Sequence, residues 1–202
     1  DADMKNLGDD PIVLFEQWFA EAGTLGLRLP TAMTLATCGA GGKPSARVVL
    51  LKGVRDGDFY FFTNYDSRKG QELAVNSQAA LVFYWEALDR EVRVEGVTER
   101  VSSSESEEYF ATRPRESQLG AWASRQSAVL AGGRDELLAR YREYEELFMG
   151  NDVPCPPHWG GYRLVPDAIE FWQGQSGRLH DRYLFSREGA LGGQWRVARL
   201  AP

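Results

Sequence analysis

The alternation of hydrophobic and polar residues predicts a mainly β chain with flanking helices. The first element is an amphipathic helix at about residues 11–22, because Asp10 and Pro11 favour a helix start and Gly23 favours its end. Its apolar residues recur at helical spacing: Leu14, Phe15, Trp18 and Phe19.

From Ala32 onward the pattern changes to short β-type runs separated by turn sequences such as GAGGKP and RDGD. The predicted strands cover residues 32–38, 45–54, 59–64, 79–85, 91–101, 162–171, 182–185 and 195–200. Further helices are predicted after Ser67, at about 104–113 with the capping pattern Ser104-x-x-Glu107, and at about 135–148. Successive short strands joined by tight turns indicate an antiparallel barrel.

The composition of the chain limits the classes of protein to which it can belong. The chain has 202 residues, 43% of them hydrophobic, so we expect one domain over residues 1–202 with a full core. A net charge of −6 argues against a general nucleic-acid or membrane-surface binder. Cys38 and Cys155 have no metal-ligand spacing, and no signal peptide or long apolar run stands out. We therefore expect a cytoplasmic protein without a metal site.

The densest chemistry lies in residues 170–182, EFWQGQSGRLHDR. If the segment is extended, Arg178, His180 and Arg182 share one face, and Leu179 and Asp181 share the other. Three potential cations on one face fit one wall of a site for an anionic ligand. A solvated edge strand is an equally good interpretation.

A second signal is NYDSRKGQEL, residues 64–73. Ser67 is a natural N-cap, which puts Arg68 and Lys69 in the first helical turn, where the helix dipole disfavours cations. A bound phosphate would compensate, because it accepts hydrogen bonds from free backbone N–H groups and from both side chains. The alternative is that both side chains point into water.

Two further groups of residues, with weaker sequence signals, could also bind an anion. Tyr109 and Arg113 lie four residues apart on a predicted helix face, with Ser117 just beyond the helix, and could converge on a second anion or simply stack at the surface. Arg47 and Lys52 bracket the strand sequence VVLL. Their odd separation sends them to opposite faces of a regular strand, so a shared site needs a bulge or strong twist.

Together these segments resemble the pyridoxine/pyridoxamine 5′-phosphate oxidase family. The resemblance runs from about residue 44 to 202 through RVVLLK, FFTNYDSRKG, REVRVEG, RPRESQLGAWASRQS, WGGY, EFWQGQSGRLHDR and RLAP. It implies an FMN-binding split β-barrel that works as a homodimer, with the flavin held between subunits.

The resemblance also implies which residues form the site. The flavin contacts fall on Arg47, Val48, Val49, Leu50, Leu51, Lys52, Phe62, Thr63, Arg68, Lys69, Glu91, Gln126, Ser127, Trp172 and Arg182. The substrate contacts fall on Lys52, Tyr109, Arg113 and Ser117 for the 5′-phosphate, and on Arg178, Leu179 and His180 over the pyridine ring. The catalytic candidates are Arg178 and His180, in a C-terminal substrate-site segment at about 170–202.

The implied reaction oxidises the C4′ amine or alcohol of pyridoxamine or pyridoxine 5′-phosphate to pyridoxal 5′-phosphate. Hydride passes to FMN, and dioxygen reoxidises the flavin and gives hydrogen peroxide. His180 could assist proton loss or position the substrate, and both roles stay open. The rival interpretations are a related phenazine-pathway flavoenzyme and a non-catalytic carrier of flavin or pyridoxal phosphate.

The chain departs from the family pattern in two places. The family usually has a longer N-terminal segment that can cover the active site, and it usually has Gln where this chain has Glu91. On a strand, Glu91 and Arg93 share a face, so they could form an ion pair. If Glu91 instead faces the flavin, its carboxylate can only accept hydrogen bonds there, whereas Gln can also donate.

Overall fold

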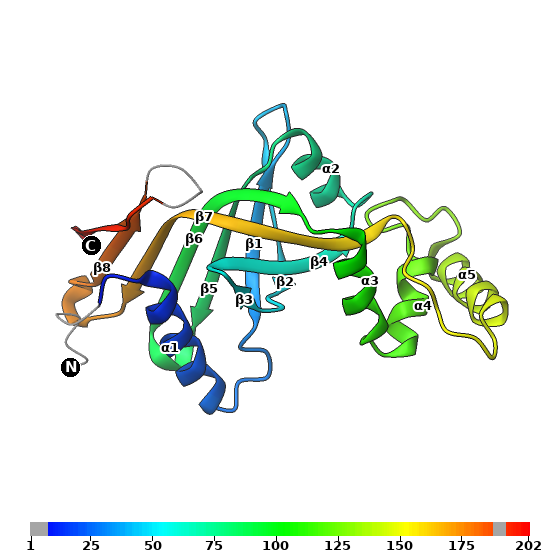
Figure 1. Cartoon of the computed structure of the whole chain (residues 1–202), viewed down its shortest axis with the longest axis horizontal. Helices are drawn as coiled ribbons and strands as arrows, with labels where there is room; N and C mark the ends of the chain where they lie inside the picture. Colours follow the sequence, from blue (N-terminus) through cyan, green and yellow to red (C-terminus); the bar gives the residue numbers. More distant parts are fainter. Residues whose placement is uncertain (1–7, 188–192) are drawn as a thin grey trace.

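The backbone is organised around one antiparallel sheet of nine strands, in a computed structural model that describes residues 8–187 and 193–202 (Figure 1). The strands are β1 (Ala32–Cys38), β2 (Pro44–Leu50), β3 (Val54–Arg55), β4 (Asp58–Asn64), β5 (Gln78–Trp85), β6 (Arg90–Arg100), β7 (Trp159–Gln173), β8 (Asp181–Ser186) and β9 (Arg196–Leu200). Their order is β2-β1-β5-β6-β7-β4-β3, with β8 on β7 and β9 on β8. The antiparallel prediction is confirmed, but the described strand path does not close into a complete barrel.

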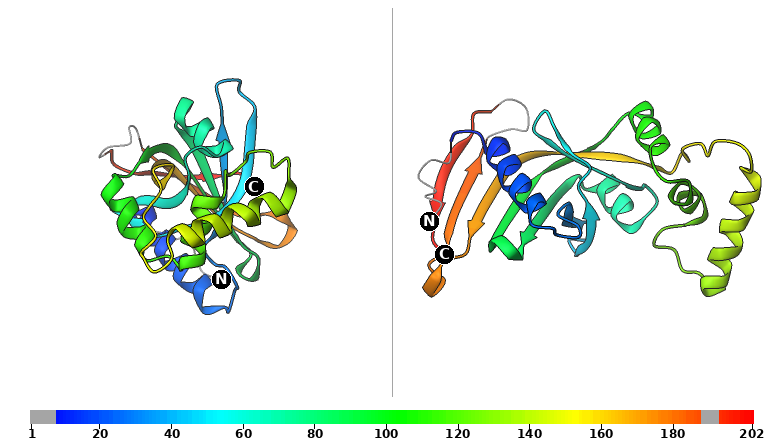
Figure 2. Two further views of the ribbon diagram at one scale, coloured as in Figure 1. Left: turned by 90° about the vertical axis from the view of Figure 1, so that its right-hand side faces the viewer. Right: turned by 90° about the horizontal axis from the view of Figure 1, so that it is seen from below.

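Strand β7, with 15 residues, is the longest of the described strands. It pairs with β6 along most of its course, with β4 near Trp159 and with β8 near Gln173. The C-terminal strands therefore lie at one end of the molecule, and three helices, α3 (Ser103–Ala111), α4 (Arg115–Ala123) and α5 (Gly133–Leu147), lie toward the other (Figures 1 and 2).

In the part of the chain that the structure describes, five α-helices accompany the sheet: α1 (Pro11–Thr24), α2 (Arg68–Val75), α3 (Ser103–Ala111), α4 (Arg115–Ala123) and α5 (Gly133–Leu147). Two short 3-10 turns are η2 (Glu86–Leu88) and η3 (Ser176–Arg178). In α1 the Asp10 side chain accepts from the Ile12 N–H, as a helix cap should. No helix in the described ranges is long and apolar enough to cross a membrane.

Three local predictions are wrong. Ser102, not Ser104, caps α3, and it accepts from the Glu105 N–H at 3.2 Å. Helix α4 was not predicted from the sequence, and Pro114 directly precedes its first turn. The single run 45–54 is interrupted, because β2 ends at Leu50 and Gly53 adopts φ +137° before β3 begins.

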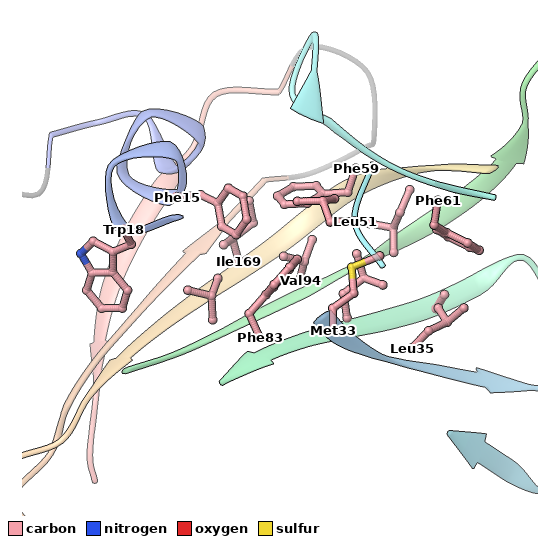
Figure 3. Packing of buried hydrophobic residues seen from close by; sticks show 14 of the residues in the cluster. Phe15, Trp18, Met33, Leu35, Leu51, Phe59, Phe61, Phe83, Val94 and Ile169 are labelled. Carbon is pink, nitrogen blue, oxygen red and sulfur yellow. The ribbon is translucent and has the colours of Figure 1, made fainter. Parts of the chain in front are cut away.

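The main core lies between α1 and the sheet (Figure 3). Phe15 of α1 is fully buried, with its ring 4.9 Å from Phe59 and 5.1 Å from Phe83, and Trp18 meets Phe171 edge-on. Each such aromatic side chain contributes about 1.5–3 kcal/mol on burial. A second, smaller core holds α3 and α4 against the Trp159 end of β7: Phe110, Leu119, Val153 and Trp159.

Candidate functional site

A cavity of about 820 Å³ lies where β2, β4, α3 and α4 meet. Many of the side chains proposed from the sequence line it: Arg47, Val48, Val49, Leu50, Lys52, Phe62, Thr63, Lys69, Tyr109, Arg113, Ser117 and Gln126. We call it the anion cavity. Four of its lining residues are Lys or Arg, and a carboxylate is not found among those described. Its charge therefore favours an anionic ligand.

The interrupted strand explains how Arg47 and Lys52 reach the same cavity. Because β2 ends at Leu50, the period-two alternation does not extend to Lys52, and both side chains line the space. Leu51 differs, since it is 4% exposed and belongs to the main core. Only the backbone of Leu51 could therefore contact a ligand in the anion cavity.

Lys69 is a buried cation at this site. It is 6% exposed, and its Nζ donates to Thr63 Oγ1 at 3.0 Å, while the Thr63 hydroxyl donates to Gln126 Oε1 at 3.2 Å. Within the described ranges it forms no ion pair. Burial, with a smaller contribution from Arg47, lowers the pKa of Lys69. A buried ammonium without a counterion is suited to receive an anion such as phosphate.

The start of α2 is partly as predicted. Ser67 is the N-cap, with its Oγ accepting from the Gly70 N–H at 3.3 Å. The Arg68 N–H is not free, because it donates to Ser127 Oγ at 3.1 Å, and Ser127 adopts φ 73° to make that contact. Arg68 and Ser127 line a neighbouring cavity of about 530 Å³, which shares Gln126 with the anion cavity.

Arg113 is a second, partly buried cation of the anion cavity. Its guanidinium lies 4.6 Å from the Trp159 ring centroid and 5.6 Å from that of Phe110. Among the described residues, Nη1 is buried and has no hydrogen-bond partner, and burial lowers the pKa of the side chain. An unpartnered guanidinium nitrogen in a cavity is available to donate a hydrogen bond to an acceptor atom of a ligand.

Aromatic rings and the residue Ser117 also line the anion cavity. Tyr109 stacks on Phe62 with 4.0 Å between ring centroids, and Lys52 Nζ lies 6.0 Å from the Tyr109 ring. Ser117 also lines the cavity, although it lies inside α4 rather than in a loop. Lys52, Tyr109, Arg113 and Ser117 therefore surround one space, as predicted, and Tyr109 and Arg113 do not merely stack at the surface.

The C-terminal candidates do not lie on one extended strand, so the shared face that an extended segment would give Arg178, His180 and Arg182 does not form. Arg178 ends η3 with φ 61°, and β8 begins only at Asp181. His180 lies 4.7 Å from Trp172, ring centroid to centroid, and its Nδ1 accepts from the Gln175 N–H at 3.1 Å. Arg182 Nε donates to Glu170 Oε1 at 2.7 Å. We call these residues the C-terminal cluster: Trp172, Arg178, Leu179, His180 and Arg182.

The anion cavity and the C-terminal cluster lie at opposite ends of β7. Trp159 lines the cavity and Trp172 belongs to the cluster, and the thirteen residue steps from one to the other correspond to about 43 Å along an extended strand. Glu91 faces Trp172 in the strand register and forms an ion pair with Arg93 at 2.6 Å. One chain therefore does not bring the two sets of predicted residues together.

Two residues that contact the cations of the anion cavity were not predicted from the sequence. Trp159 supports Arg113, and its only sequence signal is the WGGY motif. Glu72 accepts from Arg68 and lies 3.4 Å from Arg47, and it follows Arg68 at the i+4 spacing that joins side chains on a helix. That spacing could have revealed it.

Comparisons with known proteins identify the family. Residues 21–147 match the family model described as pyridoxamine 5′-phosphate oxidase, and residues 159–202 match the pyridoxine 5′-phosphate oxidase C-terminal dimerisation region. The chain is 54% identical over 200 residues to a pyridoxine/pyridoxamine 5′-phosphate oxidase of Burkholderia cenocepacia, covering 99% of this chain and 92% of the relative. It is 56% identical over 197 residues to that of Cupriavidus necator, covering 98% and 91%.

Solved structures share the fold. PhzG from Burkholderia lata 383, in complex with tetrahydrophenazine-1-carboxylic acid, matches with a TM-score of 0.92 and 32% identity over 100% of this chain and 97% of its own. A pyridoxamine 5′-phosphate oxidase-related, FMN-binding protein from Nostoc punctiforme matches with a TM-score of 0.74 and 14% identity, over 100% and 98% of the two chains. The second match supports the split-barrel fold alone.

Proposed function

The chain belongs to the pyridoxine/pyridoxamine 5′-phosphate oxidase family, and we propose that it is an FMN-dependent oxidase of pyridoxamine or pyridoxine 5′-phosphate. The products are pyridoxal 5′-phosphate and, from dioxygen, hydrogen peroxide. The observation that carries this proposal is Arg113, whose buried Nη1 lacks a partner among the described residues in a cavity lined by Lys52, Tyr109 and Ser117. A substrate phosphate would satisfy that nitrogen.

The residues of the anion cavity also fit FMN. Lys69, buried without a counterion among the described residues, and Arg47 suit the flavin phosphate, while Thr63 and Gln126 form a polar network beside them. When bound, FMN supplies the hydride acceptor and the reaction with dioxygen. The protein's own task is orientation, because both phosphates would be held by charged groups that are already in place.

A homodimer would complete this site. Because about 43 Å of β7 separates the anion cavity from the C-terminal cluster, we infer that the cluster of one subunit faces the cavity of the other. The match of residues 159–202 to a dimerisation region supports this arrangement. The cationic side chain of Arg178 and the imidazole of His180 would then lie over the substrate ring.

The hydrogen bond to His180 favours a positioning role over a role as base. Nδ1 accepts from the Gln175 N–H, so the neutral imidazole carries its proton on Nε2. Nε2 is then a donor toward an acceptor on the substrate ring. In this tautomer neither nitrogen is free to act as a base, because Nε2 already carries the proton and the Nδ1 lone pair accepts from the Gln175 N–H.

The phenazine-pathway alternative has one observation in its favour, the high structural similarity to PhzG. The identity of 54–56% to oxidases of phosphorylated substrates, against 32% to PhzG, argues for the oxidase. The anion cavity supports the same choice, because its several cations suit a phosphate dianion better than a single carboxylate.

Anaerobic absorbance spectroscopy tests the proposal. We expect the purified protein to be yellow, and pyridoxamine 5′-phosphate to bleach the flavin band without oxygen. Unphosphorylated pyridoxamine at the same concentration is the matched control and should bleach it much more slowly. A colourless protein that takes up no added FMN, or bleaching that is indifferent to the phosphate, would refute the proposed function.

A further inference from the structure

Glu72 joins two of the cations proposed to hold the flavin phosphate. Its Oε1 accepts from Arg68 Nε at 3.0 Å, and its Oε2 lies 3.4 Å from Arg47 Nη2. The hydroxyls of Thr37 and Ser45 also donate to Oε2, the latter at 2.6 Å. One carboxylate on α2 therefore ties together the β1-β2 hairpin and the first turn of its own helix.

The hydroxyls of Thr37 and Ser45 link Glu72 to Arg47 through hydrogen bonds whose donors and acceptors are fixed. Each hydroxyl has one hydrogen, and while it donates to Glu72, its lone pairs accept from Arg47 Nη1 at Thr37 and from Nη2 at Ser45. Arg47 Nη1 also donates to the Leu35 carbonyl at 3.3 Å. The orientation of the guanidinium thus depends on hydroxyl groups that Glu72 orients.

Glu72 stays ionised under assay conditions. Hydrogen bonds from Ser45 and Thr37, opposed in part by burial, lower the pKa of its carboxyl to about 2, from an ordinary value of 4.5. With an exposed side-chain fraction of 13%, the carboxylate is shielded from water, whereas 55% of the Arg68 side chain is exposed. A flexible, exposed arginine gains most from such an anchor, because holding it in place costs side-chain entropy.

We propose that Glu72 is a positioning residue for the cofactor, which holds Arg47 and Arg68 in the geometry that receives the FMN phosphate. The inference rests on the proposed FMN site. Two effects of opposite sign follow from the carboxylate: it orients the two guanidinium groups, and it repels the phosphate. Orientation is the larger effect here, because all four contacts of Glu72 are hydrogen bonds made by its two oxygens.

The test compares FMN with riboflavin, which lacks the phosphate, by fluorescence titration of the full chain stripped of flavin. Glu72→Leu removes both acceptor oxygens at similar size, Glu72→Gln keeps one, and Glu143→Leu is the control at an exposed helical glutamate. We expect Glu72→Leu to weaken FMN by about 10- to 100-fold, the equivalent of one lost charge-assisted contact. Glu72→Gln should fall between it and the wild type, and riboflavin affinity should stay constant.

Several outcomes separate this proposal from others. Equal losses for FMN and riboflavin would mean a structural role and overturn the proposal, as would tighter FMN binding in Glu72→Leu or identical behaviour of the Gln and Leu variants. Thermal unfolding of each flavin-free variant shows whether it is folded, and Glu72→Gln provides the measurement if Glu72→Leu is not. A wild-type chain that binds no FMN would instead refute the proposed function itself.

Discussion

Replacing Arg113 with Met removes the buried guanidinium of the anion cavity but keeps an apolar side chain against Trp159. A charge-assisted hydrogen bond is worth about 1.5–3 kcal/mol, so KM for pyridoxamine 5′-phosphate should rise roughly 10- to 100-fold. The kcat should change much less, because a phosphate anchor binds the ground state and the transition state alike.

We expect the same substitution to change the free energy of unfolding of the ligand-free protein only slightly. In the ligand-free protein, the lost cation–π contacts of Arg113 are worth about 0.5–2 kcal/mol, but an unpaired buried charge also disappears. These effects have opposite signs, so the free energy of unfolding should change by less than about 1 kcal/mol.

Steady-state kinetics and urea unfolding of the flavin-free protein measure both quantities, with Arg142→Met on the exposed face of α5 as the matched control. A variant that is strongly destabilised would show that Arg113 is a structural residue. An unchanged KM would refute its assignment as the phosphate anchor.

Three other substitutions test neighbouring parts of the site. Lys69→Met should weaken FMN about 10- to 100-fold and Arg68→Met less, because Lys69 is buried and Arg68 is more than half exposed; equal effects in a fluorescence titration would contradict this. Arg178→Ala should lower kcat more than it raises KM, and a change in KM alone would make Arg178 a second anchor. Glu91→Gln should alter FMN affinity and flavin midpoint potential little, since Arg93 already pairs with Glu91, whereas a raised potential would put this carboxylate at the flavin.

Periodicity predicted most elements, because their burial follows the sequence pattern directly. On β6, Val92 and Val94 are buried while Glu91 and Arg93 are partly or fully exposed, as alternation requires. The exceptions depend on backbone geometry that periodicity does not encode. Arg178 adopts φ 61° within a 3-10 turn, so the shared cationic face that would form if the segment were extended is absent there.

Most residues of the site could be predicted from the sequence, but how they come together in space could not. Lys69 was predicted from its unfavourable place in a first helical turn and Arg113 from its helical spacing with Tyr109, but their placement without counterions among the described residues depends on tertiary packing against Thr63 and Trp159. The separation of the two groups of residues follows from the length of β7. No local pattern reveals that distance, since it depends on how far one strand runs through the sheet.

The central claim is that one active site combines the anion cavity of one subunit with the C-terminal cluster of the other. Co-expression of two inactive variants tests it most directly: Lys69→Met/Arg113→Met damages only the cavity, and Arg178→Ala/His180→Ala damages only the cluster. In an isolated heterodimer one of the two shared sites is intact, so about half of wild-type oxidase activity should return. If each site lies within a single chain, every site carries a lesion, and a heterodimer as inactive as its parents would contradict the account.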